Sequence, residues 1–337
     1  MKNVLTLALA LGLAGAATAQ SNDATVTQNG SDNTADVQQA NGSMATVTQE
    51  GDDSDATVMQ SGAAHTAEIY TNSAGAFDGN GKAIARNSAT ITQIGTGSDF
   101  ARIRQGAAPS TRVQESSATI FQTGTGSNEA YIDQNIDQSG RQVQSTINQD
   151  GFNNRGETVF SANQRQNDVT LIDQTGSNNA AYQLKDDERE GSLTIIQDNS
   201  MATTSVGNRA EQYTRKDNAR TLRIEQIGDD NDAIQDIYKG SNATTLQYGS
   251  GNDAFIYTGS RGDARGFNNT FRIEQGEATL DADDNFARID ADGSDNTASI
   301  FQSMGSNNTA TISMVGGSNT ATATQVGSGN TATIVQN

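Results

Sequence analysis

The stretch ATVTQEGDDSDATVMQSG, residues 45–62, contains one motif twice, and the second copy begins eleven residues after the first. In each copy an alanine, a valine and a glutamine stand two residues apart. A spacing of two is the period of a β-strand, so these three side chains point to the same face. Glycine and aspartates separate the copies, and these residue types favour turns. We therefore expect each copy to form one strand followed by one turn.

The same seven-residue unit, N-x-A-x-(V/I)-x-Q, recurs along most of the chain, and its clearest copies lie near the two ends. Because seven is an odd number, the unit begins and ends on one face, which we expect to be the buried face. The residues predicted to point inward are Asn22, Ala24, Val26, Gln28, Asn33, Ala35, Val37, Gln39, Gln49, Gln60, Asn296, Ala298, Ile300, Gln302, Asn319, Gln325, Asn330, Ala332, Ile334 and Gln336. The predicted turn glycines are Gly30, Gly51, Gly62 and Gly327.

A short strand of this kind cannot bury a face alone, and such repeats gain stability by stacking on their neighbours. We expect two units, back to back, to form one rung of about 22 residues, with rungs stacked at ~4.8 Å. The chain contains about 26 such units, which would make about 13 rungs. The sequence therefore predicts an all-β fold, a β-solenoid or cross-β stack of two-strand rungs. Its asparagines and glutamines would form hydrogen-bonded ladders along the stack, which would satisfy their buried amides.

The first 19 residues form a predicted secretory signal peptide, because Lys2 precedes a short apolar run and a small-residue cleavage site. Residues 20–337 are predicted to form a single repeat domain. Longer segments interrupt the repeat, and we expect them to leave the stack as loops at the rung corners. These segments are residues 72–86, 106–115, 185–190, 260–266 and 277–284.

The composition is strongly acidic, with 21 basic and 40 acidic residues in the full chain. Removal of the signal peptide takes away Lys2 and leaves a formal charge of 20 − 40 = −20. This charge argues against nucleic acid as a partner, because nucleic-acid binding needs a basic surface. No later stretch approaches the ~20 apolar residues of a membrane span. The chain has no cysteine, so disulfides do not hold it together.

Few residues could carry catalysis or bind a metal. His65 is the only histidine and stands at an asparagine position of the repeat, where we interpret it as a ladder substitution. With one histidine and no cysteine we expect no enzymatic activity, no cofactor and no metal site. The acidic stretches 281–285 and 290–295 suggest calcium, but neither matches the EF-hand pattern. The tripeptide Arg-Gly-Asp at 261–263 is typical of a turn.

Two alternatives involve a soluble solenoid that stays monomeric. Outward threonines such as Thr25 and Thr27 could form an ice-binding face, although Glu68 and Tyr70 interrupt that face. Threonine is also simply a good residue for an exposed strand. Paired carboxylates could bind or cleave polysaccharide, but the sequence lacks the aromatic platforms that such a site would need.

The stretch QNGSDNTADVQQ, residues 28–39, resembles the curlin repeats of curli, the functional amyloid fibres of bacterial biofilms. Its spaced Gln, Gly, Asn, Ala and Gln return in QVGSGNTATIVQ, residues 325–336, and the resemblance extends over essentially all of the mature chain. It implies a secreted β-solenoid subunit that polymerises outside the cell into fibres for biofilm matrix and adhesion. It also implies self-association, with a nucleator subunit and an outer-membrane secretion pore as further partners.

The two ends of the predicted stack carry the expected function. Each end of a solenoid presents a row of unpaired N–H and C=O groups, which soluble solenoids usually cover with atypical repeats. Here the clearest copies of the unit stand near both ends, within residues 22–60 and 285–336. We therefore expect adhesive end rungs, so that the last rung of one copy meets the first rung of the next. Such a head-to-tail contact does not close and yields a filament.

Overall fold

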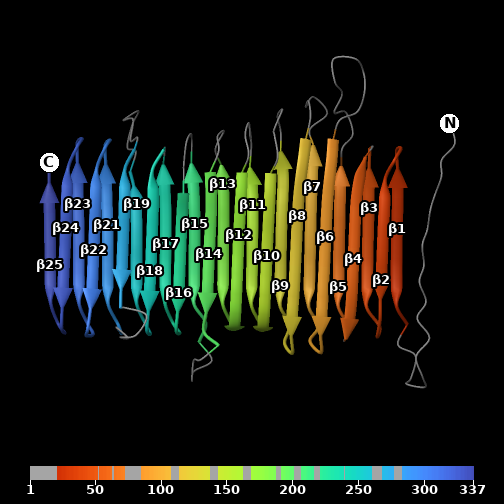
Figure 1. Ribbon diagram of the computed structural model, residues 1–337, viewed down its shortest axis with the longest axis horizontal. Coiled ribbons are helices and arrows are strands. Elements are labelled where there is room, and N and C mark those ends of the chain that lie inside the picture. Colours follow the sequence, from red (N-terminus) through yellow and green to blue (C-terminus); the bar gives the residue numbers. More distant parts are fainter. Residues whose placement is uncertain are drawn as a thin grey trace, which may run out of the picture. The chain divides into compact units, whose positions relative to one another are not determined.

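The computed structural model describes residues 21–51, 53–62, 64–72, 85–107, 114–136, 143–161, 168–186, 191–200, 206–215, 221–238, 240–259, 268–276 and 283–337. These residues form 25 β-strands and no helix (Figure 1). It follows that no helix long and apolar enough to cross a membrane occurs among them. The chain divides into two units, residues 1–169 and 170–337, with the boundary inside β12. The predicted signal peptide, residues 1–19, lies outside the described residues.

The first unit contains two parallel sheets, one of odd-numbered and one of even-numbered strands. The odd sheet has the order β1 (Asp23–Asn29), β3 (Met44–Glu50), β5 (Thr66–Asn72), β7 (Phe100–Ala107), β9 (Glu129–Ile136) and β11 (Arg155–Ser161). The even sheet has the order β2 (Thr34–Gln39), β4 (Ser54–Gly62), β6 (Ala85–Gly95), β8 (Gln114–Gly124) and β10 (Val143–Phe152). Consecutive strands therefore lie in opposite sheets, as expected for a solenoid.

The second unit repeats this arrangement. Its odd sheet has the order β13 (Ala180–Asp186), β15 (Arg209–Arg215), β17 (Asp232–Tyr238), β19 (Asp253–Thr258), β21 (Phe286–Asp292), β23 (Thr309–Val315) and β25 (Thr331–Gln336). Its even sheet has the order β12 (Asp168–Ser177), β14 (Gly191–Asp198), β16 (Thr221–Ile227), β18 (Asn242–Tyr248), β20 (Thr270–Gln275), β22 (Thr297–Ser303) and β24 (Thr320–Val326).

The sequence repeat places like residues above one another in each sheet. Ala45 pairs with Ala67, and Val47 pairs with Ile69, in the parallel register of β3 and β5. All four side chains are at most 1 % exposed. Because alanine and isoleucine alternate with outward residues, the two sheets enclose a thin apolar interior. The all-β solenoid of two-strand rungs is therefore confirmed, with 25 described strands for the ~26 predicted units.

One column of glycines shows why the turns are so restricted. Gly62, Gly95 and Gly124 are the last residues of β4, β6 and β8, and Gly151 is the last but one of β10; all four have positive φ. A Cβ atom on Gly62 would lie 1.6 Å from the carbonyl oxygen of Gly95. The rungs approach closely at this corner, so only glycine fits there.

The segments expected to leave the stack fall largely outside the described residues. The described parts show that strands extend further than the repeat pattern indicated. Gly106 and Ala107 belong to β7, and Lys185 and Asp186 belong to β13. The Lys185 side chain is fully buried, at the inward position that glutamine has in other units.

Candidate functional site: amide ladders and open end rungs

Glutamine side chains form continuous chains of hydrogen bonds inside each unit. In the even sheet of the first unit, Gln39 Nε2 donates to Gln60 Oε1 at 2.9 Å. The series continues through Gln93, Gln122 and Gln149, each step at 2.8 Å. From Gln39 to Gln122, each Nε2 donates to the glutamine of the next rung toward the C-terminus. We call this column a glutamine ladder, and its direction is the same at every step.

The second unit has a longer glutamine ladder in its even sheet. It runs through Gln174, Gln197, Gln226, Gln247, Gln275, Gln302 and Gln325, with Nε2–Oε1 distances of 2.8–3.0 Å. Each ladder also joins the two sheets. Gln226 Nε2, for example, donates to the backbone carbonyls of Arg209 and Asn231, at 2.9 and 3.0 Å. The buried amides are therefore satisfied along the stack and across it.

Asparagines form a second ladder at the turns. Asn252 donates its backbone N–H and its Nδ2 to Asn231 Oδ1, at 3.2 and 3.1 Å. In the same way, the backbone N–H and the Nδ2 of each later asparagine in the odd sheet donate to the Oδ1 atom of the asparagine before it, at Asn285, Asn308 and Asn330. Here the later rung donates to the earlier one, opposite to the glutamine ladder. The asparagine ladder therefore links the turn of each rung to the turn of the preceding rung.

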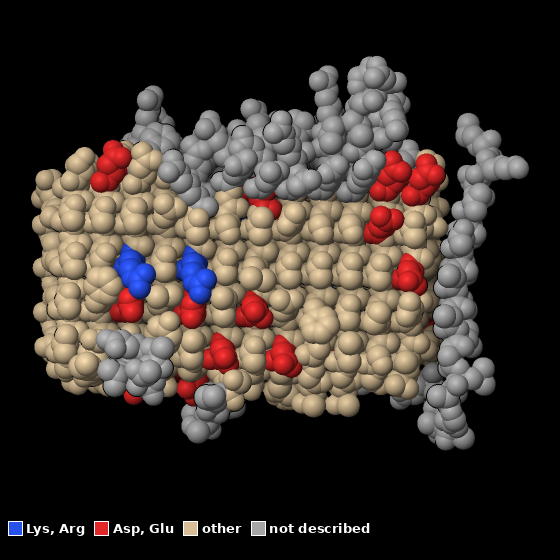
Figure 2. Space-filling view, viewed as in Figure 1, with Lys and Arg blue, Asp and Glu red and all other residues tan. Residues whose placement is uncertain are grey.

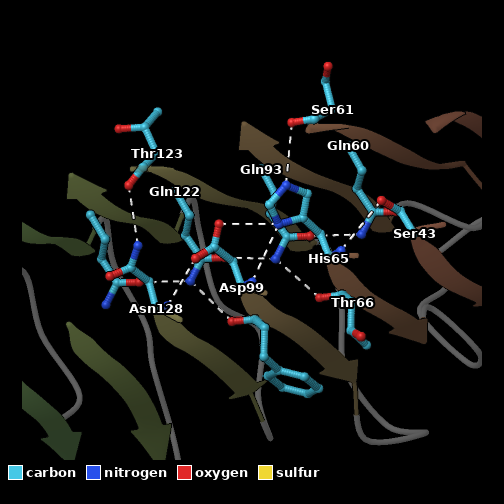
Figure 3. A network of polar contacts seen from close by, with 12 residues as sticks. Ser43, Gln60, Ser61, His65, Thr66, Gln93, Asp99, Gln122, Thr123 and Asn128 are labelled. Carbon is cyan, nitrogen blue, oxygen red and sulfur yellow. Dashed lines mark hydrogen bonds and ion pairs between the residues drawn. The ribbon is translucent and has the colours of Figure 1, made fainter. Parts of the chain in front are cut away.

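His65 lies in the asparagine column of the first unit, and its partner is Asp99 (Figure 3). His65 Nδ1 is 3.3 Å from Asp99 Oδ2, and both side chains are almost fully buried. His65 Nε2 is 3.3 Å from the carbonyl oxygen of Ser61. Asp99 Oδ1 accepts the backbone N–H of Asn128 at 2.9 Å, as an asparagine Oδ1 would. The pair therefore replaces two ladder asparagines by a buried histidine and carboxylate.

Asp99 was not predicted as a ladder residue, although Asp99-x-Ala101-x-Ile103-x-Gln105 has the spacing of the unit. A displaced glutamine ladder in the second unit was not predicted either. Gln183 Nε2 donates to Gln212 Oε1 at 3.0 Å, and Gln212 Nε2 donates to Gln235 Oε1 at 3.1 Å. These glutamines stand at the central position, where other units have valine or isoleucine.

The end rungs expose positions that are buried in the inner rungs. Ala24 is exposed and Val26 is half-buried in β1, whereas their neighbours in β3, Ala45 and Val47, are 1 % and 0 % exposed. At the other end Ile334 of β25 is only half-buried. The predicted inward residues from Asn22 to Gln28 and from Asn330 to Gln336 thus lie on open edges, and those from Asn296 to Gln302 are buried.

The amide ladders also end open at these rungs. Within the described residues, Gln28 and Gln39 donate onward but have no preceding glutamine that donates to their Oε1 atoms. Among the same residues, Gln325 is the last member of its ladder, and Gln336 lies on Met314 and follows no glutamine. Their Nε2 atoms donate to the carbonyl oxygens of Thr309 and Thr320. The first rung therefore offers amide oxygens, and the last offers amide N–H groups.

Charge differs between the two ends of the sequence. Residues 297–337 contain no charged side chain, and residues 21–81 contain nine acidic and no basic ones. Outward arginines occur between these segments, often beside an acidic residue two positions away, as in Arg272 Nη2–Glu274 Oε2 at 2.6 Å. Acidic side chains outnumber basic ones on the face shown in Figure 2. Exposed pairs of this kind stabilise the fold only slightly.

The other candidate sites gain little from the structure. The Arg-Gly-Asp tripeptide at 261–263 and the first part of 281–285 lie outside the described residues. Asp290 pairs with Arg288 at 2.8 Å, and the described residues contain no cluster of three or more metal-ligating side chains. Thr46 pairs with Glu68, so the outward threonine column that begins at Thr25 ends at the third rung.

Comparison with known proteins adds one finding. The family model described as the Curlin associated repeat matches residues 19–51 and 305–337. A search of curated proteins found no match. The two matched segments include β1, β2 and β3 at one end and β23, β24 and β25 at the other.

Proposed function

We propose that this chain, which carries curlin-associated repeats at both ends, is a secreted structural subunit that joins head to tail into extracellular, curli-like amyloid fibres. Such fibres would serve the biofilm matrix and adhesion. The observation that carries the proposal is the state of the end rungs. Side-chain positions that are fully buried in inner rungs lie open at β1 and β25. A second copy would bury them again and extend the sheets.

The open groups at the two ends favour joining unlike ends. The first rung offers the Oε1 atoms of Gln28 and Gln39, and the last rung offers the Nε2 atoms of Gln325 and Gln336. Joining two first rungs would place amide oxygens against amide oxygens and add repulsion between acidic residues. Joining last to first pairs donors with acceptors and keeps all strands parallel.

The test is assembly of purified residues 20–337, followed by electron microscopy and thioflavin fluorescence. Unbranched fibrils are expected, and persistent monomers would contradict the proposal and favour a ligand-binding solenoid. Val26→Lys and Ile334→Lys place a charge on the inward side of each end rung, so both should slow fibril growth.

The matched controls put the same charge on the outward side of the same strands. Thr25→Lys and Val335→Lys change exposed side chains and should leave growth close to that of the parent chain. Far-UV circular dichroism of each variant shows whether the strands are retained. Equal growth of all four folded variants would contradict a role for the end rungs.

A further inference from the structure

The chain has 25 described strands, so the first strand, β1, and the last strand, β25, are both odd-numbered. The two strands at each end therefore differ as partners for a neighbouring copy. β25 lies on β23, and β24 lies on β22. Each strand of the solenoid thus pairs with the strand two positions earlier in the chain, in the sheet opposite to that of its immediate predecessor. A strand that continued the path beyond β25 would lie on β24.

We propose that in the assembled fibre β1 of one copy pairs with β24 of the neighbouring copy, and β2 pairs with β25. This pairing rests on the head-to-tail assembly proposed above. It means that the odd sheet of one copy continues as the even sheet of the next. The alternative is pairing like sheets, with β1 on β25.

The glutamine ladders favour the proposed pairing. When β1 lies on β24, Gln325 Nε2 faces Gln28 Oε1 of the next copy, and Gln336 Nε2 faces Gln39 Oε1. The ladder that ends at Gln325 then continues through Gln28, and Gln336, which lies on Met314, becomes the first member of the ladder that runs on from Gln39. Both have the donor direction found inside the units. In the alternative, Gln336 faces Gln28, and Gln325 is left without an onward acceptor. That amide would be buried beside the junction, where an unmade hydrogen bond is costly.

The asparagine ladders give the same answer. Inside the second unit, a backbone N–H donates to the Oδ1 atom of the preceding asparagine, as in Asn319 to Asn296 at 3.0 Å. The proposed pairing lets Asn22 donate to Asn319 Oδ1, and Asn33 donate to Asn330 Oδ1. Pairing β1 with β25 would make a single asparagine bond instead, from Asn22 to Asn330 Oδ1. Four ladder bonds thus form in one arrangement and two in the other.

The two arrangements also differ in how many open strand edges gain a partner. In the proposed pairing the open edges of β24 and β25 both gain a partner. In the alternative, β24 and the incoming β2 lie two strand spacings apart, about 9.6 Å instead of ~4.8 Å. This gap would leave the N–H and C=O groups on one edge of β24 unpaired, and buried backbone groups are almost always paired.

Packing in the interior is also more complete in the proposed pairing. Ala323 of β24 stands where the neighbouring strand has the larger Ile300, and it is buried at 4 % exposure. The register of the unit places Val26 of the next copy over Ala323, and Val37 over Ile334. In the alternative, Val26 lies over Ile334, and no side chain of the next copy lies directly over Ala323.

Short cross-links between introduced cysteines can distinguish the two pairings, because the parent chain has no cysteine. Thr25→Cys with Thr322→Cys puts cysteines on adjacent strands in the proposed pairing. Thr25→Cys with Thr333→Cys does so only in the alternative. All three threonines are exposed on the outer face. In the wrong arrangement the two cysteines lie on opposite sheets, separated by at least ~10 Å.

Fibres of each variant are treated with a bismaleimide shorter than that separation and examined on a denaturing gel. We expect about tenfold more linked dimer for the 25/322 pair than for the 25/333 pair. Ser299→Cys with Thr322→Cys, on paired strands of one copy, confirms by peptide mass that the reagent links neighbouring strands. Fibres that link at 25/333, at both pairs or at neither overturn the proposed pairing but not assembly. Absence of fibres overturns the proposed function and the pairing with it.

Discussion

Replacing Gln93 by methionine tests whether the glutamine ladder stabilises the fold. Gln93 is fully buried and accepts a hydrogen bond from Gln60 at 2.8 Å. Its Nε2 donates to Gln122 Oε1 at 2.8 Å and to the carbonyl oxygen of Thr66 at 3.2 Å. Methionine has a similar length and volume, so the substitution removes these bonds without opening a large cavity.

The expected cost follows from the groups left behind. Gln60 Nε2 keeps its bond to the carbonyl oxygen of Met44, but Gln122 Oε1 loses the donor that Gln93 provided. One orphaned buried acceptor costs about 1–3 kcal/mol, and each exchanged bond adds roughly 0.5–1.5 kcal/mol. The two exchanged bonds are those from Gln60 and to Thr66, so we expect Gln93→Met to lower the free energy of unfolding by about 2–6 kcal/mol.

The measurement is equilibrium unfolding of the freshly purified chain in urea, followed by far-UV circular dichroism. The matched control is Gln38→Met, because Gln38 lies on the outward face of β2 and is exposed. Such a surface change should alter the unfolding free energy by less than about 0.5 kcal/mol. If Gln93→Met were as stable as Gln38→Met, the ladder would contribute nothing and the reasoning would be refuted.

Three further predictions concern a corner, a buried pair and acidity. Gly95→Ala should destabilise the chain by more than about 2 kcal/mol in urea unfolding, since its Cβ would lie 2.1 Å from Gly124 O; Gly259→Ala, with open space, should be tolerated. His65→Asn should cost about 1–3 kcal/mol, because the buried Asp99 Oδ2 loses its contact with His65 Nδ1 while Oδ1 keeps its bond from Asn128. Adding Asp99→Asn should restore stability, and no recovery would contradict the ladder interpretation. Burial raises the pKa of Asp232 and Asp236, although nearby arginines oppose it. The two carboxylates therefore bind protons more readily in the native state than in the unfolded state. The free energy of unfolding in urea should increase as the pH falls from neutral through the raised pKa values, and the increase should be smaller in Asp236→Asn.

The repeat period predicted the strands well wherever the consensus is intact. Ala45, Val47 and Gln49, for example, have the alternating spacing of the unit, and all three are buried in β3. The period was harder to see in β13, β15 and β17, where glutamine occupies the central position. A lone glutamine there would be an unsatisfied buried amide, but three in register satisfy one another. The ladder depends on like residues in neighbouring rungs, and a search for one fixed motif cannot detect that.

The candidate site was predictable in outline and not in detail. The end rungs stand out in the sequence because the consensus is clearest there. The unequal roles of β24 and β25 depend on which strand lies on which, and the sequence does not give that directly. Asp99 was missed for a related reason, since its role depends on His65, 34 residues earlier in the chain.

The uniform direction of the glutamine amides has a consequence for how a fibre would lengthen. All side-chain dipoles in one column align, so their fields add along the axis as peptide dipoles do in a helix. A fibre of such subunits would be vectorial, with two chemically distinct tips. An arriving subunit meets bare oxygens at one tip and bare amide hydrogens at the other, so the two tips would elongate at different speeds.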